Sequence, residues 1–397
     1  MDFSGRPANW RWRAETGPRA ATRKGAAPAA YRIVTATRLS RLALIASAAL
    51  MALLLALPGF AGRGLINELI FIFTMLVLAQ LWNLLAGFAG LVSVGQQAFV
   101  GLGGYLLFAL TVMAGLDPIA AILLAGVVSA LFALPTALIL FRLRGTYFAI
   151  GSWVMAEVYR LSFAQVKQLG GGTGTSLPPT ITNQVAGAAD VRLLFGVSGP
   201  AAREIVTYWL SLMLAAGTIA LVYVILRSRR GLALAAMRDS EGAAASTGVD
   251  ITLNKLWVYV IAASGTGMAG ALVYFHKARI SPDAAFSVLD WTALVIFTVV
   301  IGGIGTIEGP IIGVLILSLT QSYLAEFGTA YLILLGGLAI AVMLFAPKGV
   351  WGFISERFGI SLFPTRRRLL AVRKPAAAVK KAVKPKPRRT RRTRRRG

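Results

Sequence analysis

Long apolar runs alternate with short polar segments along most of the chain. Residues 205–226 and 256–275 contain no charged side chain, and each run is long enough to cross a bilayer as a helix, which takes roughly 20 residues. The segment between them, residues 227–255, carries a cluster of basic side chains: Arg227, Arg229, Arg230, Arg238 and Lys255. Because short loops rich in Lys and Arg stay on the inner side of a membrane, the pattern places this segment in the cytoplasm.

Further apolar runs extend the same pattern. Residues 69–116 contain no charged residue, which leaves room for two crossings joined by a turn. The glycines and the proline of residues 302–310 indicate a tight hairpin between two short or tilted spans. The remaining runs are residues 42–60, 119–141, 146–163, 290–304, 309–325 and 330–346. The pattern predicts an all-α polytopic membrane protein with about ten transmembrane helices and both termini in the cytoplasm.

The basic cytoplasmic segment contains the signals of a short helix. Asp239 or Ser240 can cap its N-terminus, Glu241 suits the positive end of its first turn, and Gly248 can end it. Its body, residues 243–246, consists of three alanines and a serine, so no large side chain keeps another surface away. This composition fits both an ordinary helical loop and a helix that a partner protein grips.

Polar residues within the apolar runs are few, and several of them gather near one turn. Ser93, Gln96 and Gln97 lie in a glycine-rich stretch, residues 86–105, inside the long uncharged run. Polar groups face lipid only at a high cost, and small residues let membrane helices approach closely. Two interpretations follow with equal weight: a broken helix that lines a translocation path, or hydrogen bonds between packed helices.

An ionisable pair lies in the run of residues 146–163. Glu157 and Arg160 are one helical turn apart, so they can pair on one face of a helix. Charged side chains inside a membrane are functional candidates by default, although a structural salt bridge explains this pair at least as well. Tyr147 lies near the start of the same run. The candidate residues of the translocation path are therefore Ser93, Gln96 and Gln97 from the polar turn and Tyr147, Glu157 and Arg160 from this run.

Residues 164–204 form the one long loop that is predicted to face outward. Its glycine-rich stretch, residues 170–179, reads G-G-G-T-G-T-S-L-P-P. It lacks the Lys-Ser/Thr of a phosphate-binding loop and does not lie between a strand and a helix, so nucleotide binding is rejected. A hinge that faces a docked periplasmic protein fits better.

Charge is segregated to the two ends of the 397-residue chain. Residues 1–41 carry a net charge of +7 and residues 364–397 carry +16, out of a total of +26. We expect a basic disordered cytoplasmic arm (1–41), a transmembrane domain (42–352) and a basic Pro/Ala-rich cytoplasmic tail (353–397). The tail suits anionic lipid headgroups, at about 1 kcal/mol per basic residue, and a solvated tail with no specific role fits nearly as well. Nucleic acid is not expected, because no aromatic residue after Phe363 can stack on bases.

Metal sites and covalent chemistry have little support in the sequence. The chain has no cysteine and a single histidine, His276, so thiolate sites are excluded and the histidine has no second ligand beside it. No nucleophile–base pair or carboxylate dyad is visible. We therefore expect no metal, no cofactor and no enzymatic activity. The scarcity of acids in the apolar runs argues against a proton- or sodium-driven carrier.

Several segments resemble the branched-chain amino acid permease family of bacterial ABC importers. The blocks lie in order between about residues 65 and 352 and include S-V-G-Q-Q-A-F-V-G-L-G-G-Y, R-G-T-Y-F-A, A-E-V-Y-R and P-K-G-V-W-G. The stretch R-D-S-E-G-A-A-A-S-T-G-V-D resembles the E-A-A–x3–G coupling loop, a cytoplasmic helix that docks into a cleft of the ATPase subunit. Gly242 departs from the pattern, because the family usually has a larger residue there.

The resemblance implies specific roles and partners. It implies a permease that pairs with a paralogous permease and works with two ABC ATPase subunits and a periplasmic substrate-binding protein in the bacterial inner membrane. Within the family, the chain resembles the longer of the two paralogous permeases. The residues to which the resemblance assigns ATPase coupling are Arg238, Asp239, Glu241, Ala244 and Gly248.

The resulting hypothesis is a permease subunit of an ATP-driven importer for branched-chain amino acids. A permease of the same architecture for urea or short amides is the first alternative, and A-E-V-Y-R and G-G-G-T-G favour the amino acid branch. A secondary transporter, or a membrane scaffold whose basic tail recruits a partner, is the alternative of another class. Dependence of transport on ATP separates this last alternative from the others.

Overall fold

The computed structural model describes residues 30–34, 38–183, 185–324, 330–358, 362–363 and 368–372. The chain divides into a large unit, residues 36–365, and a small unit of residues 1–35 and 366–397. In the small unit, β1 (Ala30–Val34) pairs antiparallel with β4 (Arg368–Val372). Residues 1–29 and 373–397 lie outside the described residues, so the expected character of most of the basic arm and of the basic tail stays a prediction.

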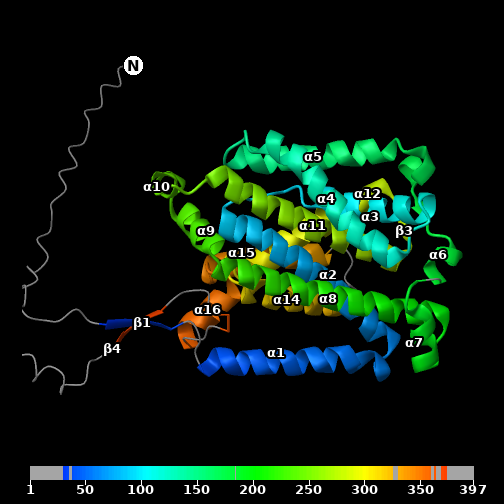
Figure 1. Cartoon of the computed structure of the whole chain (residues 1–397), viewed down its shortest axis with the longest axis horizontal. Coiled ribbons are helices and arrows are strands. Elements are labelled where there is room, and N and C mark those ends of the chain that lie inside the picture. Colours follow the sequence, from blue (N-terminus) through cyan, green and yellow to red (C-terminus); the bar gives the residue numbers. More distant parts are fainter. Residues whose placement is uncertain are drawn as a thin grey trace, which may run out of the picture. The chain divides into compact units, whose positions relative to one another are not determined.

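The large unit is a bundle of helices (Figure 1). Its first part contains α1 (Arg38–Ala56), α2 (Arg63–Asn83), α3 (Gln97–Phe108), α4 (Pro118–Leu140), α5 (Thr146–Ala164), α6 (Pro179–Asn183) and α7 (Ala188–Phe195). Its second part contains α8 (Gly199–Arg227), α9 (Arg229–Asp239), α10 (Glu241–Ser246), α11 (Ile251–Lys277), α12 (Pro282–Ala285), α13 (Leu294–Gly302), α14 (Glu308–Leu324), α15 (Ala330–Phe345) and α16 (Gly349–Phe358).

Short elements join or extend these helices. The described residues contain three π-helical turns: η2 (Leu84–Phe88) extends α2, η3 (Ala109–Met113) extends α3, and η6 (Leu289–Ala293) precedes α13. The two-residue strands β2 (Thr175–Ser176) and β3 (Arg279–Ile280) pair antiparallel. The 3-10 turns are η1 (Leu57–Gly59), η4 (Lys167–Leu169) and η5 (Gly171–Thr173).

The predicted membrane-spanning character is present. Six helical stretches of the described residues are long and apolar enough to cross a membrane: Arg63–Phe88, Pro118–Leu140, Gly199–Arg227, Ile251–Lys277, Pro282–Gly302 and Ile333–Phe358. Two shorter apolar stretches are Ile45–Gly59 and Gln97–Met113. α5 and α14, of 19 and 17 residues, coincide with two further predicted spans. The all-α polytopic fold class is confirmed, and the count of about ten helices is approximate.

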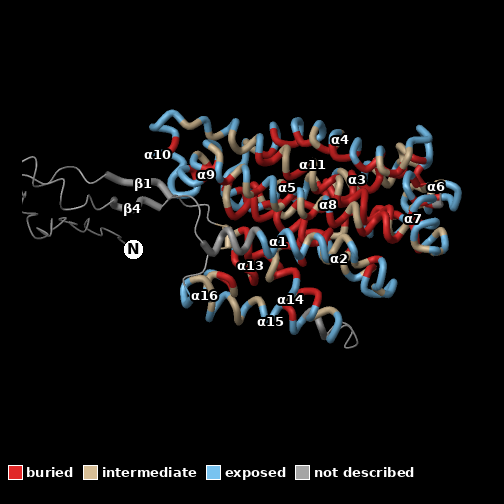
Figure 2. Tube along the Cα trace, turned by 60° about the horizontal axis from the view of Figure 1, so that its bottom comes forward, coloured by how far each residue is buried: buried red, intermediate tan, exposed pale blue. Residues whose placement is uncertain are grey.

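α2 and α11 lie at the centre of the bundle. In the most apolar stretch of each helix, the share of residues that are buried is 83% for α2 and 61% for α11, against 39% for α4 and 28% for α8. α2 packs against α8, α11, α13 and α14, while α11 packs against α3 and α4. Figure 2 shows the same concentration of buried residues along α3 and α11. The central helices are thus covered by protein, and the outer helices keep apolar faces for lipid or a partner.

Glycines allow the central helices to touch along their backbones, as the sequence pattern predicts. A methyl group at Gly103 of α3 would overlap the carbonyl oxygen of Gly267 in α11. In the predicted hairpin of residues 302–310, a methyl group at Gly302 would overlap the carbonyl oxygen of Gly309. Backbone atoms cannot move aside as a flexible side chain does, so glycine permits the close approach at both positions.

Regular structure crosses both domain boundaries that the composition suggests. α1 begins at Arg38 and α16 ends at Phe358. Beyond α16, the amides of Leu362 and Phe363 donate to the Glu308 carboxylate at 3.1 and 2.9 Å. The end of the large unit is thereby attached to the start of α14.

Candidate functional site

Residues 227–255 fold into two short helices between α8 and α11. The hydroxyl of Ser228 caps α9 by accepting a hydrogen bond from the Arg230 amide at 3.1 Å. Ser240 caps α10 by accepting from the Ala243 amide at 3.3 Å, and the Asp250 carboxylate caps α11. Each cap provides an acceptor for an amide that a helix start leaves unpaired. The local sequence therefore determines where each helix of this segment begins.

The short helix predicted after Asp239 is present. Of the two candidate caps, Ser240 is the residue used, and Glu241 stands in the first turn. α10 ends at Ser246, and Gly248 follows with φ of 86°, in the left-handed region that glycine adopts without strain. The prediction of this helix is confirmed, although the preceding helix α9 was not predicted.

The exposed face of α10 carries only small side chains. Gly242, Ala243 and Ala245 are exposed, whereas Ala244 is only 2% exposed. Glu241 accepts a hydrogen bond from the Lys255 ammonium at 2.6 Å, which ties the start of α10 to α11. α9 and α10 lie at one end of the bundle, opposite α6 and α7 (Figure 1). The helix is accessible to a second protein without rearrangement of the bundle.

The loop between α13 and α14 is hydrogen-bonded to the core helix α2 and lies beside Arg238 of α9. The Arg238 guanidinium lies 3.5 Å from the position that a methyl group would take at Gly305, in the loop between α13 and α14. From α2, the Asn83 amide donates to the Thr306 carbonyl at 2.7 Å, and the Gly305 amide donates to Asn83 Oδ1 at 2.8 Å. Asn83 therefore ties this loop to α2, and Arg238 of α9 lies beside it.

The turn predicted between two crossings, within residues 86–105, is also present, because residues 90–96 are not helical. Ser93, Gln96 and Gln97 are all buried. The Gln96 amide donates to the Leu78 carbonyl at 2.9 Å, and the Thr292 hydroxyl donates to the Gln97 side chain. These contacts show hydrogen bonding between packed segments, the second of the two interpretations. A role in translocation stays a prediction for these residues.

The remaining path candidates lie on α5. Glu157 and Arg160 form the predicted ion pair at 2.6 Å. Arg160 also binds Asp283 of α12 at 2.7 Å, a partner 123 residues away that spacing along one helix cannot reveal. Tyr147 lies at the other end of α5 and is 70% exposed. The structure therefore separates the candidate path residues into the buried break, the α5 ion cluster and Tyr147.

The glycine-rich stretch of residues 170–179 packs on the chain itself; it belongs to the loop of residues 164–204 that is predicted to face outward and is called the outer loop below. Gly174 has φ of 81°, and a methyl group there would overlap the Ile280 carbonyl oxygen. The Leu177 amide donates to the Ala278 carbonyl at 2.9 Å. Through these contacts and the β2–β3 pairing, the outer loop fixes the chain that follows α11.

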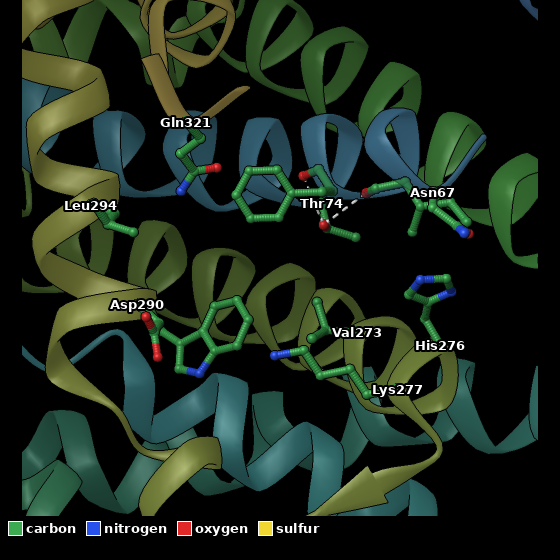
Figure 3. Close-up of a pocket in the computed structure, with 11 residues that line it drawn as sticks. Asn67, Thr74, Val273, His276, Lys277, Asp290, Leu294 and Gln321 are labelled. Atoms are coloured by element: carbon green, nitrogen blue, oxygen red, sulfur yellow. Dashed lines mark hydrogen bonds between the residues drawn. The ribbon is translucent and has the colours of Figure 1, made fainter. Parts of the chain in front are cut away.

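A cavity of about 430 Å³ lies between α2, α11, α14, η6 and the first residue of α13 (Figure 3). The sequence pattern does not predict this cavity, and of its lining residues only His276 is a candidate from the sequence, as a metal ligand. Among the described residues, no group of three or more His, Asp or Glu is placed to hold a metal. The polar residues that line the cavity are Asn67, Thr74, His276, Lys277, Asp290 and Gln321.

Comparison with known proteins identifies the family. Residues 64–346 match the family described as "Branched-chain amino acid transport system / permease component". The chain belongs to this family. The match covers most of the chain and confirms the resemblance that the sequence blocks carry, including the polytopic membrane fold and a place in an ABC transporter with other permease, ATPase and binding-protein components.

Individual relatives agree with the family assignment. The "High-affinity branched-chain amino acid transport system permease protein LivM" of Salmonella typhimurium is 28% identical over 313 residues, 76% of this chain and 73% of the relative. LivM of Escherichia coli is 27% identical over the same shares. A "Probable branched-chain amino acid transport permease protein LivH" of Methanocaldococcus jannaschii is 27% identical over 187 residues, 43% of this chain and 57% of the relative. No solved structure matches the chain.

Proposed function

We propose that this chain is a transmembrane permease subunit of an ATP-driven importer for branched-chain amino acids. The observation that carries the proposal is α10, a capped helix with a small exposed face held between two membrane-crossing helices. A permease that hydrolyses no ATP itself must receive the driving force through contact with another subunit. The family and the names of its relatives supply the substrate class.

The proposed assembly contains more than this chain. It comprises a paralogous permease as heterodimer partner, two ABC ATPase subunits and a periplasmic substrate-binding protein, in the bacterial inner membrane. The outer helices α4 and α8, with their apolar exposed faces, are available to the partner permease or to lipid. The basic residues of the α9–α10 segment support its cytoplasmic location.

The coupling residues have distinct proposed roles in this assembly. Ala244 anchors α10 on the bundle, Glu241 restrains it through Lys255, and Gly248 permits the turn into α11. Arg238, beside Asp239, lies next to the loop that Asn83 binds. When ATPase closure displaces α10, α9 and this loop transmit the displacement to α2, and the bundle rocks between two states. The buried Ser93, Gln96 and Gln97 and the α5 residues Tyr147, Glu157 and Arg160 are proposed to flank the path that opens.

The proposal is tested with a large side chain on the exposed face of α10. Ala245→Arg introduces bulk and charge where a close-fitting partner would bury them, while Ala245→Ser keeps the side chain small. Glu241→Arg is less informative because the new arginine would also face Lys255. We expect Ala245→Arg to lower ATP-dependent uptake of labelled L-leucine by about ten-fold or more, since a buried unpaired charge is costly. Co-purification of the ATPase should fall with it.

Expression and membrane insertion of both variants are checked by immunoblotting. Uptake and ATPase association that are unchanged in Ala245→Arg contradict a docking role for α10. If the importer takes up urea and not leucine, the chain is a permease for urea or short amides. Leucine uptake that persists without ATP assigns the chain to secondary transport.

A further inference from the structure

We propose that the cavity between α2, α11, α14, η6 and the first residue of α13 binds a zwitterionic α-amino acid with a branched apolar side chain. The inference rests on the proposed function and adds a site to it, because family membership assigns none of these residues. The cavity volume of about 430 Å³ falls in the range of small-molecule sites, roughly 300–1,000 Å³.

The cavity contains one positive and one negative side chain that are not paired with each other. Lys277 and Asp290 both line it, and no salt bridge within 4.0 Å joins either of them to a described residue. The close-up shows both on the same side of the cavity (Figure 3). An α-amino acid carries a carboxylate and an ammonium close together. Lys277 can bind the carboxylate and Asp290 the ammonium, each by a charge-assisted hydrogen bond.

The Lys277 ammonium is held in place by aromatic rings. It lies 5.0 Å from the centre of the Trp291 ring and 5.7 Å from that of Tyr274. The Trp291 ring is itself fixed, because its indole N–H donates to the Ala284 carbonyl at 2.8 Å. Cation–π contacts orient an ammonium while leaving its donors available to an anion. The positive charge is therefore positioned before a ligand arrives.

The backbone that carries these residues is fixed as well. Lys277 is the last residue of α11, and Ala278 closes the helix in the left-handed region with φ of 53°. The pairing of β3 with β2 then holds the next two residues against the outer loop. A site on anchored backbone binds with less loss of conformational entropy than one on a free loop.

The rest of the lining suits an aliphatic side chain and supplies further polar atoms. Ile70, Val273 and Leu294 are buried residues of the cavity wall. At its other end, Asn67 Oδ1 and His276 Nδ1 are buried without a hydrogen-bond partner among the described residues, and Figure 3 shows the two side chains near each other. Buried polar atoms are normally satisfied, so these two atoms mark a place where a ligand or water binds.

The test uses single cysteines, because the chain contains none of its own. Gln321→Cys places a thiol on the cavity lining, and Thr173→Cys places one on an exposed part of the outer loop. The importer is purified with its subunits, and labelling of this chain by a maleimide is followed with and without excess L-leucine. With leucine in about ten-fold excess over its Kd, we expect the labelling of Gln321→Cys to slow by about ten-fold, because protection grows with site occupancy, and that of Thr173→Cys to stay unchanged.

Two ligand analogues and two charge variants sharpen the result. Isoamylamine lacks the carboxylate and 4-methylpentanoate lacks the ammonium, so neither should protect Gln321→Cys. Adding Lys277→Gln or Asp290→Asn should abolish protection by leucine, whereas Arg279→Gln, a neighbouring exposed cation that does not line the cavity, should retain it. Protection that is equally strong with the analogues, or with Lys277→Gln, overturns the zwitterion assignment.

A lipid headgroup is the other source of a paired ammonium and anion. Protection that follows phosphatidylethanolamine content and does not respond to leucine assigns the cavity to lipid and overturns the proposal. ATP-dependent leucine uptake by the unmodified importer is measured in the same vesicles. If the importer takes up leucine but leucine does not protect Gln321→Cys, the proposed site is wrong and the proposed function stands. If leucine is neither taken up nor protective, the proposed function is wrong as well.

Discussion

At the scale of single residues, the structure is held by polar side chains that satisfy the backbone of distant loops. Asn83 is the clearest case, because it is fully buried and binds both a backbone amide and a backbone carbonyl of the loop after α13. An apolar substitute would leave these two groups unpaired inside the protein. The penalty for each is about 1–3 kcal/mol.

We therefore expect Asn83→Leu to lower the apparent melting temperature of the detergent-purified chain by several degrees. The matched control is Asn254→Leu, which removes a hydrogen bond of 2.7 Å to the Asp250 carbonyl within one helix. Asn254 is only partly buried, so water can replace its contact and the shift should be small. Equal shifts for the two variants would contradict the role assigned to Asn83.

At the scale of elements, close packing of α3 on α11 depends on glycine at the contact. Gly103→Ala would force the two helices apart, since the new methyl group meets backbone atoms of Gly267. Overpacking of this kind costs about 1–3 kcal/mol or more. We expect a lower yield of folded chain and a lower melting temperature. The control is Gly217→Ala in α8, where nothing lies within 4 Å of the added methyl group, and where alanine should be neutral or slightly stabilising.

If both glycine variants keep the melting temperature of the unmodified chain, α3 and α11 do not depend on this contact. A melting temperature that falls in Gly217→Ala and not in Gly103→Ala would also contradict the close packing of α3 on α11. The comparison separates the effect of steric overlap from the general effect of replacing a helical glycine.

The elements differ in how far the sequence alone could predict them. Uncharged apolar runs located α8 and α11 to within a few residues, and local cap residues located α10, because both signals are contained in neighbouring residues. α9 was not predicted, although its Ser228 cap is also a local signal, because its basic residues were interpreted only as the mark of a cytoplasmic loop. The sequence could not predict the cavity, because Lys277 and Asp290 are brought to the same cavity only by the reversal of the chain through β3 and α12. Long-range partners such as Asp283 for Arg160 were hidden for the same reason.

At the scale of the whole molecule, the two ends of the bundle are chemically different. The α9–α10 segment and its arginines lie at one end, and the outer loop with α6 and α7 lies at the other (Figure 1). α11 joins the two ends with 27 residues, and at about 1.5 Å per residue it exceeds the roughly 30 Å of a bilayer core. The two ends should therefore lie on opposite sides of the membrane.

The orientation follows from the distribution of basic residues and is tested with single cysteines. Because basic short loops remain in the cytoplasm, Ser246→Cys in α10 should lie inside and Thr173→Cys should lie outside; both positions are exposed. A membrane-impermeant maleimide added to intact spheroplasts should label Thr173→Cys at once and Ser246→Cys only after the membrane is permeabilised. The unmodified chain, which has no cysteine, provides the background. Labelling of Ser246→Cys from outside would reverse the orientation and remove α10 from the reach of a cytoplasmic ATPase, so the coupling proposal would fail with it.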